Sequence, residues 1–565
     1  MIILGLNFHF HDSTACIVKD GQLIVAIEEE RLTREKHTYE FPYQAIERCL
    51  AVASINADEI DHIAISANFK QHNFRKILYG LKHPSAAISF FKQEFWRPYN
   101  RSICFRRWYK QTFSTTQPKV HHVSHHLSHV VGSFYVSPYK KAALLSLDGS
   151  GEWSTAWLGY GDGNKVTSFA ESFFPHSLGS FYEAVTEFCG FRPNYDEGKT
   201  MGLAPFGDPA ISIDKVRQII SIDRNQQIKV DLSYFEYQNS GSRRCSQKFY
   251  DVFGKPREYS LKAPIEKHHH DTAAAFQKVL EEIAIQLCEF LHKKTKADYL
   301  VIAGGVALNS VMNGRILRDT PFKDIYIMPA AGDNGTALGA AFYVYNNALN
   351  QKRVYVHDNP FVGTEYSDTA IEKKLKKYKL QFTQSDDICH DVAKLLAEGK
   401  IVGWFQGKME IGPRSLGARS ILANPIYEDM KAKINAEVKY REPYRPFAPS
   451  IISEKTSDYF ELEVDAPFML KVCDVVEEKK SVIPAVTHVD GSARVQTVHK
   501  QTNPKYHNLI KRLGEITGVP IVLNTSFNVM GEPVVESPTD AIRCFFTTGI
   551  DTLAIGSFIV EKGGV

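Results

Sequence analysis

The 565-residue sequence contains no apolar run long enough to cross a bilayer and no C-x-x-C pair. Its nine cysteines are scattered, which fits reduced thiols in a cytoplasmic protein better than a disulfide framework or a cysteine-based zinc site. Because the first residues carry neither a basic leader nor a long apolar core, we expect no signal peptide and no membrane partner. The formal net charge of only +3 gives no general electrostatic case for nucleic acid.

The length of the chain predicts two domains, because a single hydrophobic core rarely grows to this size. Hydrophobic residues make up 44% of the chain and charged residues 23%, as is typical of globular proteins. Polar segments interrupt the pattern within residues 347–360, so we expect one domain over residues 1–352 and a second over residues 353–565.

The chain opens with three predicted strands, at residues 2–7, 14–18 and 23–27, separated by a polar turn and a hairpin turn. Such a meander begins actin-like and sugar-kinase-like folds, whose first hairpin faces bound phosphate, but it is equally typical of an ordinary sheet edge. His11 and Asp12 in the first turn are the candidate functional residues. The charge run at residues 28–37 is typical of a solvated face.

Five histidines lie within residues 121–129. On a helix, residues four apart share a face, so His125 and His129 could present two imidazoles to one metal ion, and His122 and His126 form a second such pair. The alternative is that these are surface histidines or hydrogen-bonded core histidines.

Two aspartates have a placement that suits metal ligands. Asp148 follows a predicted buried strand over residues 142–147, and Asp333 lies between a strand and a helix of small residues. Two histidines and two carboxylates suit Fe(II), Mn(II) or Zn(II) rather than calcium.

Glycines near these aspartates are candidates for binding a nucleotide. A buried strand over residues 299–303 leads into Gly304 and Gly305, and a helix begins near Asn309. Glycines let the backbone approach a ligand, and a helix N-terminus favours anions. We expect these residues to act together with Gly149.

Two further segments of the first domain draw attention. Residues 191–205 mix charges, glycines and prolines, which predicts a loop, with Glu197 and Lys199 as candidate substrate-binding residues. Residues 70–110 carry ten lysines and arginines against one acid, Glu94. They could contact an anionic acceptor or nucleic acid, but an inserted helical cap with its cationic stems on apolar surface is the favoured interpretation.

The second domain contains cationic clusters in segments rich in proline and glycine, which we predict to be loops. Converging arginines and a lysine, with asparagine and serine donors, would hold phosphoryl or carboxylate-like groups, and structural ion pairs are the alternative. The candidates are Arg414, Lys439, Arg441, Arg445, Arg494, Asn524 and Ser526.

With these motifs assembled, the whole chain resembles the O-carbamoyltransferase family, which includes the nodulation-factor enzyme and enzymes that decorate aminoglycoside, ansamycin and cephem antibiotics. The resemblance rests on several motifs in the same order, at residues 10–13, 28–33, 125–129, 196–205, 304–305, 333–335, 412–420, 439–449 and 524–528.

The resemblance implies an α/β protein with an actin-like (ASKHA, duplicated RNase H-like) N-terminal domain and a YrdC-like α/β C-terminal domain. It implies that carbamoyl phosphate and ATP form carbamoyl adenylate on Arg414, Lys439, Arg445, Arg494, Asn524 and Ser526. It also implies a divalent metal, with Fe(II) first and Mn(II) or Zn(II) as alternatives, on His125, His129, Asp148 and Asp333. His11, with Asp12 beside it, matches the family's histidine near the attacking hydroxyl.

The implied function is ATP-dependent transfer of a carbamoyl group to a hydroxyl of a small-molecule natural product. The alternative is a tRNA-modifying (threonyl)carbamoyl transferase that binds nucleic acid through residues 70–110. The small net charge and the presence of both domains in one chain favour the small-molecule acceptor. The sequence makes no prediction of the acceptor's identity or of the oligomeric state.

Overall fold

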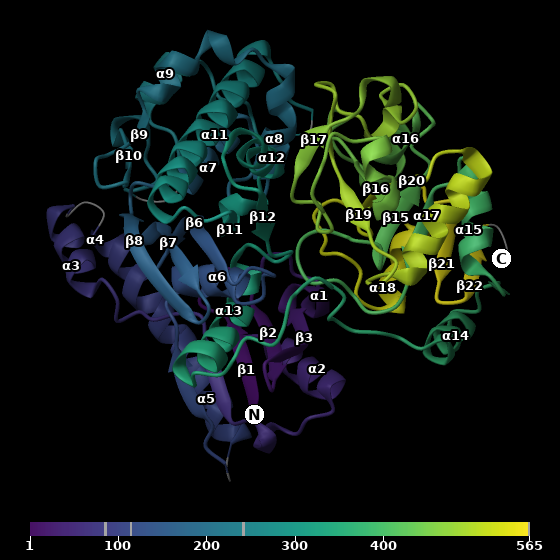
Figure 1. Cartoon of the computed structure of the whole chain (residues 1–565), viewed down its shortest axis with the longest axis horizontal. Coiled ribbons are helices and arrows are strands. Elements are labelled where there is room, and N and C mark those ends of the chain that lie inside the picture. The colour runs from purple at the N-terminus through teal and green to yellow at the C-terminus, as the bar shows by residue number, and fades with distance from the viewer. Residues whose placement is uncertain (84–86, 114–115, 240–242, 261, 563–565) are drawn as a thin grey trace. The chain divides into compact units, whose positions relative to one another are not determined.

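The computed structural model describes residues 1–83, 87–113, 116–239, 243–260 and 262–562 (Figure 1). The chain divides into two compact units. Unit 1 comprises Met1–Glu29 and His37–His357, and unit 2 comprises Glu30–Lys36 and Asp358–Val565. The short segment Glu30–Lys36 therefore packs with unit 2, although the residues on either side of it belong to unit 1.

The first sheet of unit 1 has the strand order β3-β2-β1-β4-β5. The antiparallel strands β1 (Ile2–Asn7), β2 (Thr14–Lys19) and β3 (Gln22–Glu28) form the predicted meander. The strands β4 (His62–Ile65) and β5 (Lys119–His122) extend the sheet in parallel with β1.

The second sheet repeats this arrangement. The strands β6 (Lys141–Gly151), β7 (Ser154–Asp162) and β8 (Lys165–Phe173) are an antiparallel meander, and β11 (Tyr299–Ala303) and β12 (Asp324–Ile327) run parallel to β6. The order β8-β7-β6-β11-β12 matches that of the first sheet strand for strand. Unit 1 is therefore a duplicated RNase H-like, actin-like α/β fold, as predicted.

Two helices meet backbone to backbone in unit 1. Helix α6 (His125–Phe134) follows β5, and helix α13 (Thr336–Tyr343) packs against it at Gly132 and Gly339. A Cβ atom on Gly339 would collide with the carbonyl oxygen of Ser128. This close approach requires glycine and fixes the helix that carries His125 and His129.

Segments predicted as irregular or solvated are partly ordered and buried. The predicted loop at residues 191–205 contains helix α8 (Glu197–Leu203), so that prediction is wrong. The charge run is not a solvated face either, because Glu28, Glu29, Glu30 and Arg31 are buried. Each carboxylate or guanidinium has a partner that offsets the cost of burial: Glu29, for example, accepts a hydrogen bond from the Ala45 amide at 2.7 Å.

The basic segment is helical, as predicted. It forms α3 (Asn73–Lys82), α4 (Ala87–Phe91), the turn η2 (Lys92–Trp96) and α5 (Arg97–Thr112). Residues 84–86 of this segment lie outside the described residues. In the described part of the chain, no helix is both long and apolar enough to span a bilayer.

Unit 2 is built on one mixed sheet of eight strands, with the hydrophobic core between this sheet and the helices α15 (Ile388–Ala397) and α17 (Pro504–Thr517). In spatial order the strands are β13 (Thr383–Gln384), β22 (Phe558–Glu561), β21 (Thr552–Ile555), β14 (Val402–Phe405), β15 (Arg419–Ala423), β20 (Ile521–Ser526), β16 (Ala448–Ile452) and β19 (Gln496–Val498).

Several cationic and polar candidates of unit 2 lie on regular elements rather than in loops. Lys439 ends the helical turn η9 (Asn435–Lys439), and Arg494 ends the short strand β18 (Ser492–Arg494). Asn524 and Ser526 lie on β20. The loop prediction is therefore wrong for these four residues, because tertiary pairing extended the strands and turns past the proline-rich and glycine-rich stretches.

We expect Gly339→Ala to lower the free energy of unfolding by about 1–3 kcal/mol, because the added methyl must push α13 away from α6. Gly198→Ala is the matched control, since a Cβ atom there meets nothing within 4 Å. Denaturant titration measures both. Equal stability of the two variants would contradict the close approach of α6 and α13.

Candidate metal centre and anion site

Four buried donors converge in unit 1. The Nε2 atoms of His125 and His129 lie 3.0 Å apart. The Oδ2 atom of Asp148 lies 3.1 Å from Nε2 of His125, and the Oδ1 atom of Asp333 lies 3.2 Å from Nε2 of His129. All four ligand atoms lie within 4.8 Å of one another, so the cluster could hold a metal ion.

The local backbone places each of these donors. His125 and His129 are one turn apart on α6, as the spacing predicted. Asp148 lies within β6 rather than after its end, at a point where the register to β7 shifts. Gly151 then passes so close to His125 that a Cβ atom would collide with the imidazole ring, which explains a glycine at this position.

The second histidine pair does not form. His126 is hydrogen-bonded to Ser146 Oγ and to the carbonyl oxygen of Ser154, both at 2.9 Å, so it is a core residue with satisfied ring nitrogens. Burial, together with the charge of His125, lowers the pKa of His126 to about 3. His122 lies 3.1 Å from the carbonyl oxygen of Ala67.

The electrostatics of the cluster favour a cation. Burial alone would lower the pKa of His125, but Asp333 and Asp148 outweigh burial and raise it to about 10. The two carboxylates therefore stabilise positive charge between them. Two imidazole nitrogens and two carboxylate oxygens are a donor set that fits Fe(II), Mn(II) or Zn(II).

The glycine candidates surround Asp148. Gly304 has φ +90°, and the amide of Gly305 donates to Asp148 Oδ1 at 2.9 Å. Gly149 lies against Gly179, where a Cβ atom on Gly179 would come within 2.8 Å of the Gly149 Cα atom. Asn309 caps α12 (Ser310–Asp319) through the Met312 amide and exchanges hydrogen bonds with Gln277.

His11 and Asp12 form a triad with a residue that the sequence did not single out. The Oδ1 atom of Asp12 lies 2.6 Å from Nδ1 of His37, and its Oδ2 atom lies 3.3 Å from Nδ1 of His11. Asp12 adopts a left-handed backbone, with φ 61°, and its carbonyl oxygen accepts from Thr14 Oγ1. His37 is the last residue of the charge run at residues 28–37, and no spacing in the sequence indicates that it contacts Asp12.

Glu197 and Lys199 have different surroundings on α8. Burial, and next the charge of Glu183, raises the pKa of Glu197 to about 8. Lys199 forms an ion pair with Asp196 at 3.2 Å and lies over the ring of Phe191. The structure therefore pairs Lys199 with Asp196, one turn earlier in the chain.

The arginines of unit 2 gather around Arg494. Burial, and next the charges of Arg414, Arg441 and Arg445, lower the pKa of Arg494 well below its usual range. The Nε atom of Arg494 is buried without a hydrogen-bond partner among the described residues. Positive charges that act on one another in this way repel, so a bound anion would stabilise the cluster.

The polar candidates of unit 2 lie on neighbouring strands and turns. Lys439 is buried, and its ammonium group donates to Asn528 Oδ1 at 2.9 Å, to Ser526 Oγ at 3.2 Å and to the Ser526 carbonyl oxygen. Asn524 donates to Gln496 Oε1 at 3.1 Å. Burial, and next the charge of Arg441, lowers the pKa of Lys439 well below its usual range.

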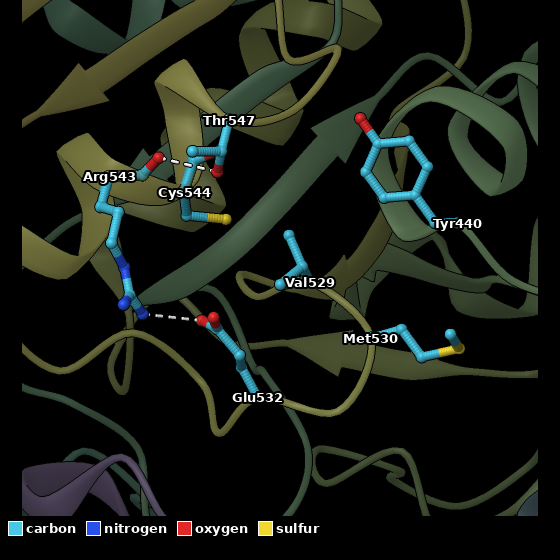
Figure 2. A pocket seen from close by; sticks show the side chains of 7 residues that line it. All are labelled: Tyr440, Val529, Met530, Glu532, Arg543, Cys544 and Thr547. Carbon is cyan, nitrogen blue, oxygen red and sulfur yellow. Dashed lines mark hydrogen bonds and ion pairs between the residues drawn. The ribbon is translucent and has the colours of Figure 1, made fainter.

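A cavity of about 370 Å³ in unit 2 is lined in part by Tyr440, the residue after Lys439. Its lining combines apolar side chains with an ion pair between Arg543 and Glu532 at 2.8 Å (Figure 2). Sequence reasoning did not single out the lining residues, which are Tyr440, Val529, Met530, Glu532, Arg543, Cys544 and Thr547.

We expect His129→Ala to weaken binding of Fe²⁺ or Zn²⁺ by at least about 100-fold, because it removes one of the four donors. Calorimetric titration and metal analysis of the purified protein measure the loss. His121→Ala is the control, since His121 lies at 3.1 Å from His62 and outside the cluster. Unchanged metal affinity in the His129 variant would contradict the assignment.

Known proteins provide a separate comparison. Residues 2–342 match the family described as Carbamoyltransferase N-terminus, and residues 393–562 match Carbamoyltransferase C-terminus. The uncharacterized protein sll1178 of Synechocystis is 39% identical, over 99% of this chain and 96% of that protein. The nodulation protein NolNO of Sinorhizobium fredii is 37% identical, over 98% of this chain and 80% of that protein.

A third relative carries a reaction in its name. The 3'-hydroxymethylcephem-O-carbamoyltransferase of Amycolatopsis lactamdurans is 30% identical over 64% of each chain. The resemblance predicted from the motifs is thereby confirmed. Both halves of this chain match the corresponding family halves, in order and over most of their length, and the chain belongs to the carbamoyltransferase family.

Proposed function

We propose that this protein is an O-carbamoyltransferase that converts carbamoyl phosphate and ATP to carbamoyl adenylate and transfers the carbamoyl group to a hydroxyl of a small-molecule natural product. The observation that carries the proposal is a pair of oppositely charged sites, one in each unit. Unit 1 holds the buried donor cluster of two histidines and two aspartates, and unit 2 holds the half-buried cluster of Arg414, Arg441, Arg445 and Arg494. The name of the cephem relative supports an O-linked acceptor.

The arginine cluster of unit 2 suits the first half-reaction, which handles only anions. A carbamate oxygen, formed when carbamoyl phosphate loses phosphate to water, attacks the α-phosphorus of ATP, and pyrophosphate leaves. Arg414, Arg445 and Arg494 would hold the phosphoryl groups, because arginine presents a planar fork of donors to phosphate oxygens. Charge stabilisation and alignment are the main requirements of such a step.

Further side chains of unit 2 assist in this step. Lys439 would neutralise charge on the leaving pyrophosphate. Ser526 and Asn524 would orient the carbamoyl group. Arg441 would add positive charge beside the other arginines. We propose that residues 353–565 form the YrdC-like adenylate-forming domain.

Unit 1 suits the second half-reaction, which transfers the carbamoyl group. A metal ion held by His125, His129, Asp148 and Asp333 would supply Lewis acidity toward phosphate or carbamoyl oxygens. His11 would accept the proton of the acceptor hydroxyl while that oxygen attacks the carbamoyl carbon and AMP leaves. Asp12 and His37 would hold the His11 ring in the orientation that this proton transfer needs.

Backbone groups of unit 1 would receive the nucleotide. The glycines Gly149, Gly304 and Gly305 leave room for a phosphate close to the main chain, and Asn309 fixes the start of α12 nearby. Glu197 and Lys199 would contact the acceptor side. We further propose Fe(II) as the native metal, a cytoplasmic location and residues 1–352 as the transfer domain.

We expect Arg445→Ala to reduce ATP–pyrophosphate exchange that depends on carbamoyl phosphate by at least about 100-fold, because the adenylate-forming site loses a phosphate-binding guanidinium. Bound metal should be unchanged.

His125→Ala should show the reverse, with loss of metal and of carbamoyl transfer but normal exchange. The measurements are radiolabel exchange, metal analysis and the mass gain of one carbamoyl group on a panel of hydroxylated metabolites.

Lys455→Ala is the control for Arg445→Ala, since this exposed lysine of unit 2 pairs with the nearby Asp458 at 3.0 Å. If either Arg445→Ala or His125→Ala eliminates both half-reactions in a folded protein, this division of labour is wrong. Exchange that does not require carbamoyl phosphate would contradict the proposed substrate.

His37 gives a test of the triad. His37→Ala removes the partner of Asp12, so we expect the kcat for carbamoyl transfer to fall about 10–100-fold with little change in the KM for the adenylate. His37→Asn places an amide nitrogen near the former Nδ1 position and should restore part of the rate. A similar loss in both variants, or a loss of pyrophosphate exchange, would argue against a positioning role.

A further inference from the structure

Helix α3 presents an apolar stripe away from the protein. Phe74, Ile77, Leu78 and Leu81 follow the i, i+3, i+4, i+7 spacing of one helix face and are all exposed, Phe74 to 80% and Leu81 to 74%. The opposite face is anchored, because Tyr79 packs on the rings of Trp153 and Phe174. A surface helix of a globular protein normally turns such a stripe toward the core, so this stripe needs another explanation.

Helix α4, which contacts α3, carries further exposed apolar side chains. Its Phe90 packs on Tyr79, with the ring centroids 5.3 Å apart, while Ile88 is 87% exposed and Phe91 is also exposed. We name the combined surface the α3–α4 patch. It comprises Phe74, Ile77, Leu78, Leu81, Ile88 and Phe91.

Exposed cations accompany the patch. Arg75 and Lys82 lie on α3, Lys92 follows α4 directly and Arg97 begins α5, and all four are exposed. The one acid of this segment, Glu94, pairs with the buried Lys76 at 3.0 Å and so neutralises a different charge. The surface therefore combines aliphatic and aromatic side chains with an excess of positive charge.

This combination discriminates between possible partners. A second copy of the chain would place the same patch against itself in a twofold interface, which brings like charges together. Nucleic acid offers phosphates to the cations but no apolar phase to the isoleucines and leucines. An anionic bilayer offers both, since acyl chains lie directly below negatively charged headgroups.

We propose that the α3–α4 patch docks this protein on the surface of an anionic lipid bilayer. Phe74, Leu81 and Ile88 enter the boundary between headgroups and acyl chains, and the neighbouring cations bind lipid phosphates. Such interfacial binding needs no membrane-spanning helix, and it departs from the sequence-based expectation of no membrane partner. It is independent of the proposed carbamoyl-transfer activity.

The test is flotation of the full-length protein with vesicles. Vesicles of phosphatidylcholine with about one third phosphatidylglycerol should bind at least about tenfold more tightly than phosphatidylcholine alone, and added salt should weaken that binding. Lys82→Glu with Lys92→Glu should remove the preference for anionic lipid. Equal binding to neutral and anionic vesicles, or no binding to either, would overturn the proposal.

A second variant isolates the apolar contribution. Phe74→Ser with Leu81→Ser should lower vesicle binding at least about tenfold, because two large side chains no longer enter the bilayer. Ile211→Ser is the matched control, since Ile211 is 60% exposed elsewhere in unit 1. Circular dichroism establishes that each variant is folded. If the patch variant instead abolishes a dimer seen by light scattering without lipid, a second copy covers this face and the bilayer proposal is wrong.

Discussion

Two imidazoles and two carboxylates converge in one buried space in unit 1, and the packing of the surrounding helices and strands holds these four groups together. Burying a carboxylate costs free energy unless a positive charge lies beside it. Asp148 and Asp333 accordingly raise the pKa of His125, which favours its charged form. Segments far apart in the sequence, which carry the two histidines, Asp148 and Asp333, must therefore pack against one another. Glycines at the crossing of α6 and α13, and at Gly151, permit the distances that four converging donors require.

Unit 2 presents the opposite electrostatic situation. Partial burial, and next the charges of neighbouring arginines, lower the pKa values of Arg414 and Arg494, and a bound anion would offset the repulsion between these side chains. A site that favours a cation in unit 1 and a site that favours anions in unit 2 would suit the two different steps of the proposed reaction. Under the proposed function, activation of carbamoyl phosphate would use the arginines, and delivery to a hydroxyl would use the donor cluster with the His11–Asp12–His37 triad.

Charge in this sequence was a poor guide to exposure. The run at residues 28–37 looked solvated, yet Arg31 is buried and donates to the Gly412 carbonyl oxygen at 2.7 Å within unit 2, and Glu28 accepts from Asn334 at 2.7 Å within unit 1. Each of these partners lies about 300 or more residues away in the chain. No local pattern could predict them. In the basic segment, by contrast, the local helical pattern was predicted correctly, while the outward direction of its apolar stripe was not.

The sequence by itself determined the strands of the opening meander, the α/β class, the pairing of His125 with His129 and the family, because periodicity, i to i+4 spacing and ordered motifs are local properties of the chain. Tertiary structure decided the rest. It brought Asp148 and Asp333 to the two histidines, joined His37 to Asp12 across 25 residues, assembled the arginines around Arg494 and placed Glu30–Lys36 in unit 2. The placement of Asp148 and Asp333 beside predicted strands indicated candidate ligands, but the distances between these groups depend on how two repeated sheets and one mixed sheet fold, which local sequence does not specify.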